Sequence, residues 1–102
     1  MSFVASLPLL AAILSNPITV VPLECGVILE GYDTDGDANN GPEIIMVKTS
    51  DGRLLATAYF GPGDDGQFLY AEVPENGKIV RYEAAVFAAK YPSPCALAGR
   101  DT

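Results

Sequence analysis

The sequence predicts an all-β protein, folded as a single small antiparallel β-sandwich. Between residues 27 and 91, short segments rich in Val, Ile, Leu and aromatic residues alternate with turns of Gly, Asp, Asn and Pro. The turns include Asp51-Gly52, Asp65-Gly66 and Asn76-Gly77, pairs that reach positive φ easily and join strands in hairpins. Several short strands at such spacing, within 102 residues, are typical of one sandwich or barrel domain.

The expected strands follow in order along the chain. They cover residues 18–21, 26–31, 43–49, 53–60, 67–73 and 78–87. Pro17 and Pro22 bound the first segment and favour an edge strand, and residues 33–42 form a long polar loop. Residues 83–90 are Ala-rich, so a helical turn is the alternative there. Period-two spacing predicts inward side chains at Val27, Leu29, Ile45, Val47, Leu55, Phe68, Tyr70, Val80 and Tyr82.

Residues 3–14 form an uncharged apolar segment that Pro8 interrupts. They resemble the apolar part of a signal peptide, but no Lys or Arg precedes them and no Ala-x-Ala site closes them, so we expect the segment to be retained. The segment is too short to span a membrane. An apolar arm must be buried, and we expect it to dock on a neighbouring subunit, although packing on its own domain is the alternative. Its apolar side chains are Phe3, Val4, Leu7, Leu9, Leu10, Ile13 and Leu14.

Residues 26–92 show a series of motifs in a recognisable order. A Val-Ile-Leu-Glu-Gly strand at 27–31 precedes Gly41-Pro42 and the Asp51-Gly52 turn. After these come Asp-Gly-Gln-Phe at 65–68, Val-Pro-Glu-Asn-Gly at 73–77 and Tyr-Pro at 91–92. This part of the chain resembles the carboxypeptidase regulatory-like or prealbumin-like (transthyretin-like) β-sandwich domains. The resemblance implies an Ig-like or prealbumin-like sandwich, and such domains are accessory, adhesive or filament-forming modules more often than enzymes.

Composition argues against several classes of function. The chain has no His, which removes the commonest general base and metal ligand. A net charge of −7 with scattered basic residues argues against nucleic-acid binding. Charged residues make up only 19% of the chain, which suggests that a partner covers apolar surface. We therefore expect no enzyme, no cofactor and no membrane span.

Four groups of residues are candidate sites. Asp33, Asp35 and Asp37 alternate in the polar loop and form a weak calcium candidate, because Ala38 and Ile44 occupy positions where an EF-hand needs Gly and Glu. Asp64-Asp65 is more consistent with turn residues than with an acid pair. The aromatic residues could form a ligand platform, but core and cross-strand pairs are the commoner role. Cys25 and Cys95 could pair with each other, pair between subunits or remain thiols.

The sequence therefore predicts a non-enzymatic subunit that assembles with itself or other proteins. We expect an N-terminal arm or edge strand at 1–24, a sandwich domain at 25–95 and a C-terminal tail at 96–102. Two kinds of assembly are consistent with such a subunit. One is a virion, in which it would be a decoration or capsid-associated protein, and the other is an extracellular filament or adhesion structure. A small acidic inhibitor of a host protein is the third possibility.

Overall fold

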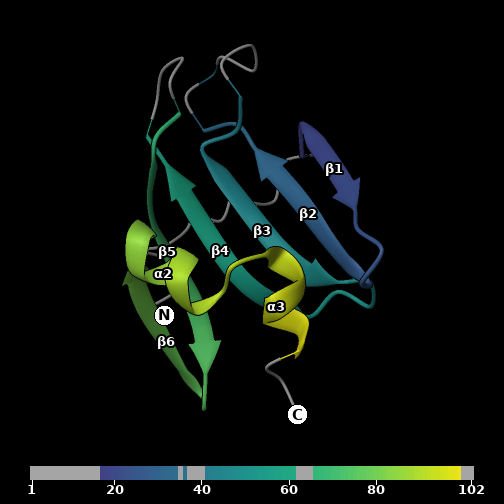
Figure 1. Ribbon diagram of the computed structural model, residues 1–102. Coiled ribbons are helices and arrows are strands. Elements are labelled where there is room, and N and C mark those ends of the chain that lie inside the picture. Colours follow the sequence, from purple (N-terminus) through teal and green to yellow (C-terminus); the bar gives the residue numbers. More distant parts are fainter. Residues whose placement is uncertain (1–16, 35, 37–40, 62–65, 100–102) are drawn as a thin grey trace, which may run out of the picture.

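The computed structural model describes residues 17–34, 36, 41–61 and 66–99, which form one antiparallel sheet with two short helices on it (Figure 1). The sheet has six strands in the order of the sequence, β1 to β6. They are β1 (Thr19–Pro22), β2 (Val27–Tyr32), β3 (Ile44–Thr49), β4 (Leu54–Phe60), β5 (Phe68–Glu75) and β6 (Lys78–Glu83). The predicted antiparallel strands are thus confirmed, and each strand pairs with its neighbours in the sequence.

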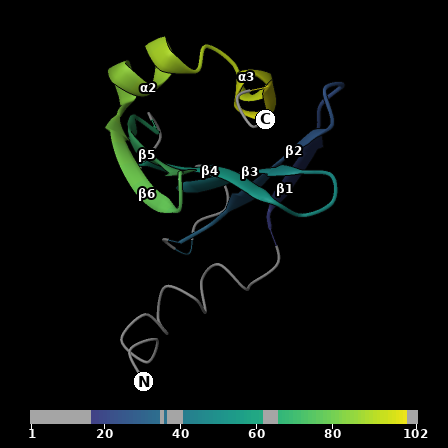
Figure 2. The same ribbon diagram turned by 90° about the horizontal axis from the view of Figure 1, so that it is seen from below.

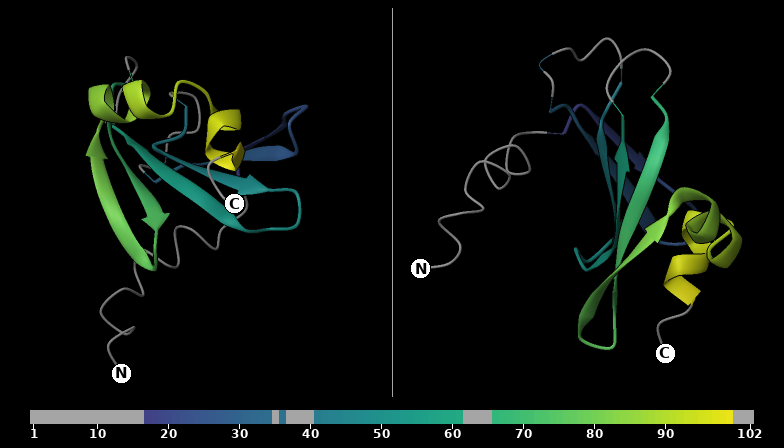
Figure 3. Two further views of the ribbon diagram at one scale, coloured as in Figure 1. Left: turned by 60° about the horizontal axis from the view of Figure 1, so that its bottom comes forward. Right: turned by 90° about the vertical axis from the view of Figure 1, so that its left-hand side faces the viewer.

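Helices α2 (Ala84–Lys90) and α3 (Pro94–Gly99) form the second layer, where the sandwich prediction expects another sheet. Both lie on the same side of the sheet (Figures 2 and 3). The strand expected at 78–87 ends at Glu83. Ala is the best helix former, and the following segment Ala-Ala-Val-Phe-Ala-Ala-Lys takes the helical alternative.

Local turn chemistry sets the β5–β6 hairpin. Asn76 and Gly77 have φ angles of 53° and 78°, as a two-residue type I′ turn requires. This turn pairs Glu75 with Lys78 and fixes the register of the whole hairpin, up to Tyr70 opposite Glu83.

The core lies between the sheet and the two helices. Its buried members are Val27, Val47, Leu55, Ala56, Val73, Tyr91 and Leu97. Of the side chains predicted to point inward, Leu29 and Tyr82 pack against this cluster, and Ile45 and Phe68 line the space beside it. Val80 pairs with the buried Val73.

Tyr70 was wrongly predicted to point into the core. It pairs with Tyr59, on the sheet face away from the helices. A register shift between Tyr59 and Phe60 places Phe60 opposite Phe68 and leaves Leu69 as the extra residue. Because such a bulge changes which face the following residues occupy, strict alternation from Phe68 fails.

A disulfide joins Cys25, in the turn between β1 and β2, to Cys95 in α3. This is the first of the three states that the sequence leaves open. Residues 96–99, which the sequence assigns to the C-terminal tail, continue α3, and Leu97 is 1% exposed. This segment packs on the domain because the side chain of Leu97 is buried and Cys95 is covalently bonded to the β1–β2 turn.

Candidate functional site

An apolar pocket of about 240 Å³ lies between the sheet and the helices. Its floor consists of side chains from β2 to β5, namely Leu29, Ile45, Val47, Ala58, Phe60 and Phe68. Its other wall comes from α2, α3 and the segment between them: Phe87, Ala88, Tyr91, Pro92, Ser93, Pro94 and Leu97. No lining side chain among the described residues carries a charge.

Aromatic rings form one side of this pocket. Phe60 and Phe68 stack with 5.1 Å between ring centroids, and Phe87 meets Phe68 edge-on at 5.8 Å. Tyr91 continues the series, 5.5 Å from Phe87. The sequence predicts core or cross-strand roles for these rings, and Tyr91 lies in the core with Phe87 packed against it. The bulge in β5 and the position of α2 also place the four rings around an open space.

A carboxylate outside the pocket fixes the end of α2. Glu75 accepts hydrogen bonds from the hydroxyl of Tyr82 at 2.8 Å and from that of Tyr91 at 2.6 Å. The ammonium of Lys90 lies 5.9 Å and 5.7 Å from the same two ring centroids, at the limit of a cation–π contact. The Tyr91 ring therefore presents carbon to the pocket while its hydroxyl is satisfied elsewhere. Nothing in the sequence pattern singles out Glu75, because its two partners come from β6 and from beyond α2.

The pocket is suited to apolar groups rather than to chemistry on a polar substrate. A water molecule needs two to four polar partners, and the only lining side chains with a polar group are Ser93 and Tyr91, whose hydroxyl is bonded to Glu75. An enclosed apolar cavity of roughly 150 Å³ already takes up a benzene-sized molecule, so a space of this volume can hold aliphatic or aromatic side chains.

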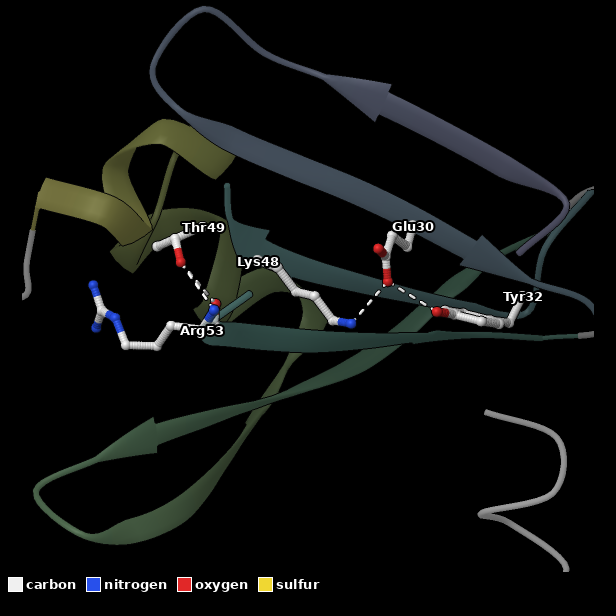
Figure 4. A network of polar contacts seen from close by, with 5 residues as sticks. All are labelled: Glu30, Tyr32, Lys48, Thr49 and Arg53. Atoms are coloured by element: carbon white, nitrogen blue, oxygen red, sulfur yellow. Dashed lines mark hydrogen bonds and ion pairs between the residues drawn. The ribbon is translucent and has the colours of Figure 1, made fainter. Parts of the chain in front are cut away.

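The opposite face of the sheet is polar. Glu30 on β2 binds the ammonium of Lys48 at 2.9 Å and accepts the hydroxyl of Tyr32 at 2.8 Å (Figure 4). The hydrogen bond from Lys48, followed by that from Tyr32, holds the pKa of Glu30 below its usual value of 4.5. Burial, together with the bond to Glu30, raises the pKa of Tyr32.

A second polar cluster lies further along this face. Tyr59 donates its hydroxyl to Glu72 at 3.0 Å, and Arg81 approaches the same carboxylate at 3.7 Å. Burial, then the Glu72 carboxylate, raises the pKa of Tyr59 to about 12. Tyr59 stacks on Tyr70 at 4.7 Å, and the guanidinium of Arg81 lies 4.0 Å from the Tyr70 ring centroid. Because β5 lies between β4 and β6, Tyr59 and Arg81 contact the Tyr70 ring from the two neighbouring strands. The ring therefore takes part in cross-strand pairs and does not form a ligand platform.

The calcium candidate falls largely outside the described residues. Asp33 is described, whereas Asp35, Asp37 and the pair Asp64-Asp65 lie outside them. Within the described part of the chain, no group of three acidic or Cys side chains is placed to hold a metal ion. The arm residues from Phe3 to Leu14 also lie outside the described residues.

One carboxylate near this loop was missed by the sequence reasoning. Glu43 is 6% exposed and accepts the backbone N–H of Thr34 at 2.8 Å and its hydroxyl at 3.3 Å. It therefore closes the base of the polar loop, a structural task that explains why a carboxylate is buried at the start of β3.

No family model, curated protein or solved structure matches this chain. Across the described part of the chain, none of the helices has the length and apolar character needed to cross a membrane.

Proposed function

We propose that this protein is a non-enzymatic assembly subunit, and that the apolar arm of one copy occupies the pocket of another. The observation that carries the proposal is the uncharged pocket between the sheet and helices α2 and α3. It needs an apolar occupant, and residues 3–14 of the same chain are an uncharged apolar segment.

The energies support this match. Each aliphatic side chain moved from water into an apolar site gains about 1.5–3 kcal/mol. The arm offers Leu7, Leu9 and Leu10 in close succession, and Pro8 favours an extended course there. An extended segment presents successive side chains to opposite sides, so alternate residues reach the pocket together.

The chemistry of the lining also favours assembly over catalysis. The lining has no carboxylate, amine or thiol, and the hydroxyl of Ser93 has no His in the chain to activate it as a nucleophile. The polar clusters around Glu30 and Glu72 are internally paired and lie on the other face.

We propose that the assembly works outside the reducing cytosol. The disulfide between Cys25 and Cys95 supports this setting, because disulfides persist on virions and cell surfaces and are rare in the cytosol. Both settings proposed from the sequence, a virion decoration or capsid-associated protein and an extracellular filament or adhesion subunit, meet that condition. The resemblance of residues 26–92 to prealbumin-like sandwich domains favours the filament.

The test compares the mass of the full chain with that of Ala88→Phe by light scattering. Ala88 lies in α2 on the pocket wall, so an added ring fills the space the arm needs. Ala89→Phe is the matched control, because Ala89 is an exposed residue of the same helix outside the lining. We expect the assembly of Ala88→Phe to have a lower mass than that of the unaltered chain, and Ala89→Phe to assemble like the unaltered chain.

Deleting residues 1–17 tests the arm itself. We expect a variant that keeps its circular dichroism spectrum and no longer assembles through the pocket. An unfolded deletion variant would show that the segment belongs to the fold of its own copy. An unaltered chain that is monomeric would overturn the proposal and favour the acidic inhibitor.

A further inference from the structure

The two edges of the sheet, β1 and β6, differ in their capacity to accept another strand. An edge strand presents unpaired N–H and C=O groups, and proteins usually protect it with Pro, charges or a bulge.

Proline protects the β1 edge. Leu23 donates its N–H to the carbonyl of Val27 at 2.8 Å, so these two residues form a hydrogen-bonded pair. Hydrogen-bonded and non-hydrogen-bonded pairs alternate along an antiparallel ladder, so the backbone groups of Val20 and Pro22 point away from β2. Pro22 has no N–H to offer, and the N–H of Ile18 is already donated to Gly31 at 2.8 Å. Among residues 18–22, only Val20 then presents an outward N–H.

The β6 edge contains no proline. The two-residue turn makes Glu75 and Lys78 a hydrogen-bonded pair, so Val80 and Tyr82 also bond to β5. The N–H and C=O groups of Ile79 and Arg81 therefore point outward.

β6 carries charged residues at its two ends, Lys78 and Glu83, and one between them, Arg81. The Arg81 guanidinium lies back over Tyr70, 4.0 Å from the ring centroid, and near Glu72 at 3.7 Å. Ile79 is apolar and 63% exposed. The edge thus combines open backbone groups with exposed apolar surface.

We propose that β6 pairs with β6 of a second copy, antiparallel and centred on Val80. Ile79 of each copy then faces Arg81 of the other, and these residues exchange both N–H···O=C bonds. Val80 meets Val80 of the second copy, and Lys78 lies opposite Tyr82. The two sheets become continuous through an isologous contact.

Side-chain charges favour this register over its neighbours. A shift that centres the pair on Arg81 sets like charges directly opposite each other, which is destabilising. Centring it on Ile79 brings Gly77 of the turn opposite Arg81, where the strand has ended. The register centred on Val80 avoids both. It uses neither the pocket nor residues 3–14, so this contact is independent of the proposed arm.

Cross-linking of Val80→Cys in the full chain tests the contact. Side chains in directly opposed pairs have Cβ atoms about 4.5–5.5 Å apart, so a short bifunctional thiol reagent joins the introduced thiols at the two-fold axis. Val86→Cys is the control, because Val86 is 55% exposed on α2, outside the proposed contact. We expect covalent dimers to form from Val80→Cys at least about tenfold faster than from Val86→Cys, because only the first pair of thiols is held in contact. Equal rates for the two variants would overturn the proposal.

Adding Ile79→Lys to Val80→Cys should remove this cross-linking, whereas Val20→Lys, the matching change on the β1 edge, should leave it intact. Loss with both, or with neither, contradicts pairing through β6. Adding Ala88→Phe instead should leave cross-linking unchanged, which separates this contact from the arm.

Hydrogen exchange of the unaltered chain provides a readout without substitutions. The amides of Ile79 and Arg81 should exchange more slowly as protein concentration rises, and that of Val20 should not respond. Concentration-independent exchange at Ile79 and Arg81 would also overturn the proposal.

Discussion

Cys95 in α3 is bonded to Cys25 in the β1–β2 turn, with 5.8 Å between their Cα atoms and a sequence separation of 70. Helix α3 has six residues, and an isolated helix of that length is unstable in water. The disulfide and the buried side chain of Leu97 therefore hold this helix, and with it one wall of the pocket.

We predict that replacing both cysteines, Cys25→Ser with Cys95→Ser, lowers the free energy of unfolding by about 4 kcal/mol. The value follows from the closure entropy of a loop of this length in the unfolded chain. Urea denaturation measures it, with the unaltered chain under a dithiol reductant as the parallel sample. An unchanged midpoint in both samples would show that the bond adds nothing to stability.

We predict that Leu97→Ala costs about 2–5 kcal/mol of stability, because it removes a fully buried side chain and leaves a cavity beside the pocket. Leu69→Ala removes the same atoms from a side chain that is 47% exposed, and should cost less than half as much. Similar losses for the two variants in urea denaturation would mean that α3 does not pack as described.

We predict a loss of stability in alkali that depends on Tyr59. Its pKa is raised from 10.0 to about 12 in the folded protein, so the folded state holds this proton more tightly than the unfolded chain. The resulting stabilisation is complete below pH 10 and is lost as pH rises toward 12. Tyr59→Phe should unfold with a shallower dependence on pH across that range. If the free energies of unfolding of the two proteins fell in parallel between pH 10 and pH 12, the raised pKa would not belong to Tyr59.

We predict that calcium does not stabilise the protein. The loop containing Asp33, Asp35 and Asp37 lacks a carboxylate at its twelfth position, so its oxygen ligands are too few for tight binding. Melting temperatures with EDTA and with added calcium chloride should coincide. A rise of several degrees that EDTA reverses would assign a metal site to this loop.

Turn residues made much of the sheet predictable. Asn76-Gly77 specifies its hairpin through backbone conformations that few other pairs adopt, and the structure shows the positive φ angles expected. The strands on either side follow from short apolar segments, which the neighbouring turns delimit. Tyr70 shows the limit of this reasoning, since the bulge at Leu69 leaves no mark in the alternation of apolar residues.

The positions of most strands, their antiparallel pairing, the absence of His and the uncharged arm could be read from the sequence, because they depend on residue type and near neighbours. That helices rather than a second sheet cover the core could not be read from the sequence. Local sequence leaves both a strand and a helix open for Ala84–Lys90, and packing against the sheet selects the helix. The tertiary structure also decided the pairing of Cys25 with Cys95 and the space among Phe60, Phe68 and Phe87. These features join residues distant in sequence, and their free energy depends on which surfaces meet when the chain closes on itself.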